Sequence, residues 1–271
     1  MKNCITYLVR ASDKDIEEFN QSLALIEKNL LPFCENVDVI VFHEADLIPF
    51  MDKIKTKVSL IYKEIKFVLP DYPPEILKEI PELYPHPTHQ NGPIAYWHKG
   101  FTMGYRHMCQ FFFCDIFQYI KDYNYSMRLD TDSFIHTPLK YDIFKYMENM
   151  DAIYSYIEPA VQLDNPLVCQ NLNLIVRNWL VDEQIPIRQN IDNIPNGKLY
   201  YTNYEICKVD WFVNDTRSQL FYQFIKNTGK IFSARWGDHI LRYLQINLFA
   251  DMKRVIPSHG FVYQHGATYN V

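Results

Sequence analysis

Apolar positions near the start of the chain follow first a strand period and then a helix period. Residues 5–9 are a short apolar run, which is typical of a buried strand. Ser12 with an acidic residue three positions later is a helix start signal, and Pro32 marks where that helix must end. Between them, apolar residues recur at helical spacing at Ile16, Phe19, Leu23, Ile26 and Leu30. A second apolar run at 37–42 completes a strand–helix–strand unit, which predicts the opening of a parallel α/β sheet.

The middle of the chain is less regular and contains one strongly aromatic helix. Residues 58–69 predict another strand, and the segment 70–93, rich in Pro, His and Asn, predicts a long surface loop. Residues 103–120 predict the aromatic helix. A short strand at 125–129 then runs directly into the acidic residues of 130–132.

The second half of the chain alternates between helical and irregular patterns. It predicts helices at 141–150, 216–227 and 235–249, a strand at 152–156, a partly helical segment at 165–179, a loop at 184–198 and an irregular tail at 257–271. We therefore predict an α/β fold with a mainly parallel central sheet flanked by helices, in one domain over residues 1–271.

Composition and charge exclude several classes of protein. With 271 residues, 48% hydrophobic and 15% aromatic, the chain has enough apolar material for an ordered core. A net charge of −5 lacks the basic footprint of a nucleic-acid-binding protein, so we expect no nucleic-acid partner. The apolar run near the N-terminus is too short for a signal peptide, and no stretch reaches the roughly 18 apolar residues of a membrane span. We therefore expect a soluble protein without a transmembrane segment.

Asp130 and Asp132 are the strongest chemical signal in the sequence. They follow a predicted strand, at the edge where parallel sheets present the carboxyl ends of their strands and bind ligands. Carboxylate oxygens suit Mg²⁺ or Mn²⁺, which would link the pair to a diphosphate. Because D-x-D is a common pattern, a turn that carries two solvated acids stays open on spacing alone. At the end of the first strand, Arg10 and Ser12 are candidate nucleotide contacts, and Ser12 is equally explained as a helix cap.

Six short motifs occur in one order along almost the whole chain. They are Y-L-V-R-A-S at 7–12, Y-R-H-M-C at 105–109, R-L-D-T-D at 128–132, T-N-Y-E-I at 202–206, R-W-G-D at 235–238 and Y-Q-H at 263–265. In order and nearly in spacing they resemble the fungal α-1,2-mannosyltransferase family, glycosyltransferase family 15. R-W-G-D matches that family letter for letter, whereas Asp130 stands where the family has Glu.

The resemblance implies a GT-A-type fold, a requirement for Mn²⁺, GDP-mannose as donor and transfer with retention of anomeric configuration. It also implies a role for each matching residue. Asp130, with Asp132, and His265 would hold the metal, and Tyr105 would lie by the donor diphosphate. Glu205 would face the anomeric carbon, and Asp238 would lie on the acceptor side.

Each of these assignments has a structural alternative. Glu205 lies in an apolar stretch, where an acid is costly unless it is paired or functional, so it is either a catalytic group or a salt-bridged structural acid. Asp238 follows a glycine and can be a helix N-cap. Tyr105 can be a core residue, and His265 an ordinary surface histidine.

The implied partners are a sugar nucleotide donor and a glycan or glycoprotein acceptor, so the implied process is protein glycosylation. The shortened carboxylate at Asp130 keeps two alternatives open. One is a D-x-D transferase that uses another donor, such as a UDP-sugar, and the other is an inactive sugar-nucleotide- or glycan-binding protein. With no anchor in the sequence, we expect the cytoplasm, whether of a cell or of a virus-infected host, in preference to the Golgi lumen.

Overall fold

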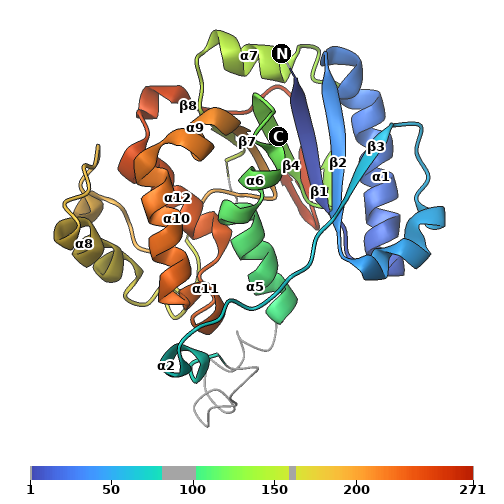
Figure 1. The fold of residues 1–271 in the computed structure, drawn as a ribbon. Helices are drawn as coiled ribbons and strands as arrows, with labels where there is room; N and C mark the ends of the chain where they lie inside the picture. The colour runs from blue at the N-terminus through green and yellow to red at the C-terminus, as the bar shows by residue number, and fades with distance from the viewer. Residues whose placement is uncertain (1, 81–101, 159–162, 271) are drawn as a thin grey trace.

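The computed structural model describes residues 2–80, 102–158 and 163–270, and a seven-stranded sheet lies at its centre (Figure 1). The strands in spatial order are β3 (Leu60–Glu64), β2 (Val37–His43), β1 (Asn3–Leu8), β4 (Tyr125–Leu129), β7 (Tyr204–Lys208), β6 (Tyr154–Tyr156) and β8 (Val255–Pro257). All neighbouring pairs are parallel except the two that involve β7. The mainly parallel sheet expected from the sequence is therefore confirmed.

Helices cover both faces of this sheet. The helices of the described residues are α1 (Asp13–Asn29), α2 (Pro74–Leu77), α5 (Met103–Gln110), α6 (Phe117–Ile120), α7 (Ile143–Asn149), α8 (Leu172–Asp182), α9 (Val209–Asn214), α10 (Thr216–Thr228), α11 (Lys230–Ser233) and α12 (Asp238–Phe249), of which α2 and α8 lie away from the sheet (Figure 1). Short 3₁₀ turns lie at Leu31–Phe33, Ala45–Lys53, Ile191–Asn193 and Met252–Arg254. In the described part of the chain, no helix combines the length and apolarity needed to cross a membrane.

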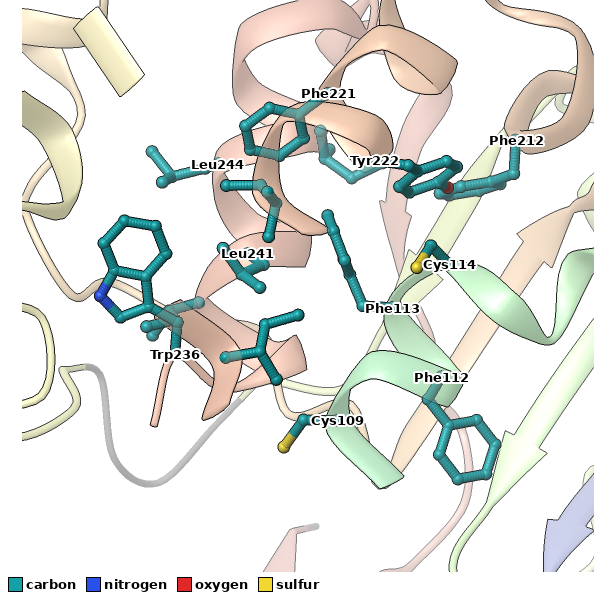
Figure 2. Close-up of a cluster of buried hydrophobic side chains, with 14 of the residues drawn as sticks. Cys109, Phe112, Phe113, Cys114, Phe212, Phe221, Tyr222, Trp236, Leu241 and Leu244 are labelled. Carbon is teal, nitrogen blue, oxygen red and sulfur yellow. The ribbon is translucent and has the colours of Figure 1, made fainter. Parts of the chain in front are cut away.

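Alternation along the strands divides the buried side chains between two cores. On β4, Tyr125, Met127 and Leu129 face the core that includes α1 and α7, whereas Arg128 faces the opposite side. The second core lies between the sheet and α5, α10 and α12, where aromatic rings interlock (Figure 2). There, the rings of Phe113 and Tyr222 meet edge to face with centroids 5.0 Å apart. Charged side chains on the second face are therefore enclosed by aromatic residues.

The start of the chain folds as its pattern predicts. The Ser12 side chain accepts a hydrogen bond from the Asp15 backbone N–H at the start of α1. The predicted strand at 58–69 is shorter, at Leu60–Glu64, and the predicted loop at 70–93 includes the short helix α2. The remainder of that loop, residues 81–93, lies outside the described residues.

Two predicted helices differ from the structure because of their backbone turns. The helix expected at 103–120 is interrupted by a π-helical turn at Phe111–Asp115, where the Ile116 N–H donates to the Phe111 carbonyl at 2.8 Å. The helix expected from residue 235 begins at Asp238, because Arg235 has a left-handed φ of 63° and Gly237 is the N-cap. The structural alternative in which Asp238 serves as the helix N-cap is therefore wrong by one position.

The irregular tail predicted at 257–271 is a further error. Val255–Pro257 is strand β8 of the main sheet, and β9 (Tyr263–His265) and β10 (Thr268–Asn270) join β5 (Ser133–Ile135) in a small antiparallel sheet. Each of these strands has three residues, which is too short for a period to be recognised. β8 pairs with β6 and β9 pairs with β5, which are both distant in sequence, so no local signal predicts these two pairings.

Candidate active site

The acidic turn after β4 is held by one buried hydroxyl. The Ser133 N–H donates to the Asp130 carbonyl at 3.0 Å, and Ser133 Oγ accepts from the Asp130 N–H at 3.2 Å. The same hydroxyl donates to the Asn203 carbonyl at 3.0 Å and lies 2.8 Å from the Tyr263 hydroxyl. Ser133 is fully buried, and its contacts fasten the turn to Asn203, which directly precedes β7, and to Tyr263 of the tail strand β9.

Asp130, Asp132 and His265 form a cluster in which one possible ligand atom of each lies within 4.8 Å of the others. His265 Nε2 lies 3.1 Å from Asp132 Oδ1 and 3.9 Å from Asp130 Oδ2. Each side chain is 27–30% exposed, so solvent and ligands reach the cluster. Two carboxylates and an imidazole are a ligand set that suits Mn²⁺.

The tail places His265 in this cluster through its strand pairing. His265 lies opposite Ser133 where β9 pairs with β5. The next residue, Gly266, has a φ of +54° and donates its N–H to the Asp132 carbonyl at 3.2 Å. The hairpin between β9 and β10 is therefore fastened to the acidic turn itself.

The proton affinities of the cluster reflect this contact. Burial alone would raise the pKa of Asp132, but the hydrogen bond and charge of His265 lower it below its usual value. Burial alone would lower the pKa of His265, but Asp132 and Asp130 raise it above its usual value. A metal at this position would compete with a proton for the His265 nitrogen.

A cavity of about 420 Å³ opens beside the cluster, at the carboxyl ends of the parallel strands β1, β2 and β4. Its lining comes from Leu8, Val9, Arg10, Asp15, Glu44, Asp46, Phe67, Thr102, Gly104, Tyr105, Met108, Phe112, Asp130, Thr131 and Asp132. A volume of several hundred Å³ at this edge of an α/β sheet is typical of a small-ligand site. The structure thus brings Arg10, Tyr105, Asp130 and Asp132 together around one cavity.

Arg10 and Ser12 differ in their position relative to the cavity. Arg10 is exposed and donates to both oxygens of Asp15, with the shortest contact at 2.9 Å. Ser12 caps α1 and is absent from the cavity lining among the described residues. Tyr105 is half-buried in the lining, and burial raises the pKa of its hydroxyl well above the ordinary value. That Arg10, Ser12 and Tyr105 contact a nucleotide stays a prediction.

Asp238 is buried and forms an ion pair with Arg128, the arginine of the R-L-D-T-D motif. Arg128 donates from Nη1 to Asp238 Oδ2 at 2.5 Å and from Nε to Asp130 Oδ1 at 2.9 Å. Thr202 Oγ1 donates to the same oxygen of Asp238 at 2.7 Å. Burial would raise the pKa of Asp238, but the Arg128 guanidinium holds it far below its usual range. The guanidinium also stacks over the Phe112 ring, with Cζ 3.6 Å from the centroid.

Glu205 lies opposite Arg128 across the antiparallel pair of β4 and β7, and only 3% of it is exposed. Arg242 Nε donates to Glu205 Oε2 at 3.1 Å, and Arg242 Nη2 donates to the Phe112 carbonyl at 2.9 Å. Glu205 lines a separate cavity of about 10 Å³, and Phe112 lines this cavity and the larger one. The π-helical turn explains why the Phe112 carbonyl is available to Arg242. In an uninterrupted α-helix the Ile116 N–H would donate to the Phe112 carbonyl, whereas here it donates to the Phe111 carbonyl.

Several contributing residues were missed by the sequence interpretation. Arg128 and Arg242 are both buried, and each neutralises a carboxylate singled out from the sequence. A charged residue inside an apolar strand or helix was the available signal for both. No local signal marked Asp164, which accepts from His239 and Arg235 over a long sequence separation.

Comparisons with known proteins agree with this architecture. A sequence profile of the glycolipid 2-alpha-mannosyltransferase family matches residues 1–271. The probable mannosyltransferase MNT3 of Candida albicans is 25% identical, over 92% of this chain and 72% of that protein. The probable mannosyltransferase KTR3 of Saccharomyces cerevisiae is 24% identical, over 61% of this chain and 43% of that protein. The chain thus matches less than half of the length of KTR3.

A solved structure shows the same fold. Core-mannan synthase A (CmsA/Ktr4) from Aspergillus fumigatus, in its Mn/GDP form, superimposes with a TM-score of 0.80 at 18% identity. The superposition covers 99% of this chain and 76% of the synthase. The expected GT-A-type α/β fold is therefore confirmed. Since the family profile covers every residue, the chain belongs to the glycolipid 2-alpha-mannosyltransferase family, glycosyltransferase family 15.

Proposed function

We propose that this chain is a metal-dependent, retaining glycosyltransferase that moves mannose from GDP-mannose to a hydroxyl of a glycan or glycoprotein. The observation that carries the proposal is the cluster of Asp130, Asp132 and His265, whose two carboxylates line the 420 Å³ cavity. Family membership supports the reaction class, and the Aspergillus relative was solved with Mn and GDP. We further propose that residues 1–271 act as one domain.

The cluster fits Mn²⁺, or Mg²⁺ in its place. Asp130 and Asp132 offer oxygen ligands, and neutral His265 offers a nitrogen, which Mn²⁺ accepts more readily than Mg²⁺ does. When bound, the metal neutralises the charge that develops on the leaving diphosphate. Arg128 orients Asp130 through its hydrogen bond, and the turn fixed by Ser133 positions both carboxylates.

The far end of the cavity favours a guanine base over uracil. Glu44 and Asp46 line it, and both are acceptors when ionised. Guanine presents an N–H and an adjacent amino group to an acceptor, whereas uracil presents one N–H beside two carbonyl oxygens. Acidic side chains therefore attract the first base and repel the carbonyl oxygens of the second.

Glu205 and Asp238 are proposed to contribute from beneath the cavity. The carboxylate of each contacts an arginine, and the cavity lining includes neither residue among those described. Phe112 lines both cavities and Glu205 only the smaller one, so we propose that Glu205 acts through its charge and without direct contact, by stabilising positive charge that develops at the anomeric carbon. Asp238 acts on the acceptor side by holding Arg128.

A thermal-shift titration with nucleotides tests the proposal. GDP with Mn²⁺ is expected to stabilise the fold, by about 2.7 kcal/mol at 100 times Kd, and EDTA is expected to remove the effect. IDP lacks the amino group of guanine and is expected to bind less tightly than GDP. The difference in affinity between GDP and IDP is expected to be smaller in the variants Glu44→Gln and Asp46→Asn. Equal shifts with and without metal would contradict the metal site, and a larger shift with UDP would favour a UDP-sugar donor. Binding of GDP without any hydrolysis or transfer of GDP-mannose would identify a non-catalytic binding protein.

A further inference from the structure

Charges of alternating sign lead inward from the candidate metal site. Arg128 joins Asp130 to Asp238, at 2.9 and 2.5 Å. Beyond Asp238, its other oxygen Oδ1 lies 3.9 Å from His239 Nδ1, and His239 Nε2 lies 2.9 Å from Asp164 Oδ2. His239 therefore stands between two carboxylates, one of which holds the arginine that reaches the candidate metal ligand.

The backbone around His239 is shaped to keep its ring in place. A Cβ atom on Gly237 would clash with His239 Cε1, so only glycine fits beneath the ring in its present position. Arg235 adopts a left-handed φ of 63° and donates from Nη2 to Asp164 Oδ1 at 3.1 Å. A non-glycine residue is held in this conformation only when the surrounding contacts enforce it. The turn at 235–238 thus carries both partners of Asp164.

The charge of His239 follows from the groups that face it. Burial would lower its pKa, but Asp164 and Asp238 raise it to about 9, so the ring is an imidazolium at neutral pH. Arg235 and Arg128 lie on the far sides of these two carboxylates. Asp238 therefore has a cation on each side, Arg128 at Oδ2 and His239 towards Oδ1.

We propose that His239, held by Asp164, is a positioning residue that fixes Asp238 and thereby keeps Arg128 correctly shared between Asp238 and Asp130. The inference rests on the proposed function, because it assigns His239 and Asp164 to the same metal-dependent site. Without the imidazolium, the Asp238 carboxylate is held at Oδ2 alone, by Arg128 and Thr202, and loses the cation towards Oδ1 that fixes its tilt relative to Arg128. The charge of Arg128 then falls on Asp130 alone, and a cation already paired with a metal ligand opposes the binding of a second cation.

The test compares Mn²⁺ binding by the full chain with that of His239→Gln, Asp164→Asn and the double variant. Free Mn²⁺ is measured by electron paramagnetic resonance, and transfer or hydrolysis of GDP-mannose is measured across the same Mn²⁺ range. Each single variant is expected to weaken Mn²⁺ binding about tenfold, with a smaller change in donor KM. The double variant is expected to be no weaker than the worse single variant, because both changes break one chain of contacts.

Controls separate this role from plain stabilisation. His259→Gln and Asp192→Asn change an exposed histidine and an exposed, ion-paired aspartate away from the cluster, and both are expected to bind Mn²⁺ as the unchanged chain does. Equal Mn²⁺ affinity in the unchanged chain, His239→Gln and Asp164→Asn would overturn the positioning role, even if both variants melt earlier. A chain that binds Mn²⁺ in the expected order but never uses GDP-mannose would refute the proposed function alone. Partial recovery of Mn²⁺ binding in Asp164→Glu would support the charge contact.

Discussion

Two clusters of the same residue types lie at one edge of the sheet, and they differ in what surrounds them. The first contains Asp130, Asp132 and His265, each between a quarter and a third exposed. The second contains Asp238, His239 and Asp164, whose side chains are 4–16% exposed. Arg128 contacts both, so the two clusters are neighbours with a shared cation.

Fixed cations account for the difference between the clusters. In the buried cluster Asp238 contacts Arg128 and His239, and Asp164 contacts His239 and Arg235. In the open cluster two carboxylates share the imidazole and one guanidinium contact. The open cluster therefore keeps negative charge for a metal, whereas the buried one is already neutralised. Whether a carboxylate in this region can bind a metal ion therefore depends on the cations that already contact it.

The largest expected effect comes from neutralising the open cluster. Asp130→Asn and Asp132→Asn should each lower turnover about a thousandfold, which corresponds to ~4 kcal/mol of transition-state stabilisation. Both side chains are partly exposed, so the melting temperature should change little. The measurement is turnover at saturating Mn²⁺ beside a thermal melt, with the exposed Asp151→Asn as the matched control. Near-normal turnover in both variants would mean that the open cluster does not hold the metal.

Glu205 tests whether a buried, paired carboxylate can still act in catalysis. Glu205→Gln keeps the shape of the side chain and removes its charge, so donor affinity should persist while kcat and kcat/KM fall together, about a hundredfold. Steady-state kinetics and GDP binding measure the two effects, and Glu148→Gln on the exposed face of α7 is the control. A variant impaired only in donor binding would make Glu205 a nucleotide contact.

Local patterns predicted the parts of the molecule that depend on local contacts. The unit β1–α1–β2 follows from its own spacing, and Asp130 and Asp132 were placed correctly at a strand end because they follow β4 directly. His265 had no such signal. Its position depends on the pairing of β9 with β5, across about half the chain, and only the motif resemblance indicated it.

The buried cluster was unpredictable for the same physical reason. Asp164 and His239 are 75 residues apart, and neither has a local pattern that indicates the other. The contact between Arg242 and Glu205 depends on which face of α12 lies against β7. The contact between Arg242 and the Phe112 carbonyl depends on the π-helical turn. Long-range pairing of charges requires the tertiary arrangement, which periodicity alone does not supply.

The buried cluster should also reveal itself in the pH dependence of stability. The pKa of His239 is raised from 6.5 to about 9 in the folded chain. The contribution of protonated His239 to the free energy of unfolding is therefore fully present below about pH 6.5 and is lost as the pH rises through 9. His239→Gln should cost about 3 kcal/mol at pH 6, and the difference should shrink by pH 10. Urea unfolding at both pH values measures it, with His259→Gln as the control, and a cost independent of pH would show that the ring is not held as a cation.

The smallest expected effect belongs to His265, the nitrogen ligand that the open cluster offers beside its two carboxylates. Its pKa is raised by Asp132 and Asp130, so protons compete with Mn²⁺ for its nitrogen as the pH falls. His265→Ala should weaken Mn²⁺ binding about tenfold and leave an affinity that varies less between pH 8 and about 6. Removal of the chain from Tyr263 onward should do more, because Tyr263 also anchors Ser133 in the acidic turn. A Mn²⁺ titration of activity at several pH values measures both, and superimposable curves for the unchanged chain and His265→Ala would show that the tail packs against the site without binding its metal.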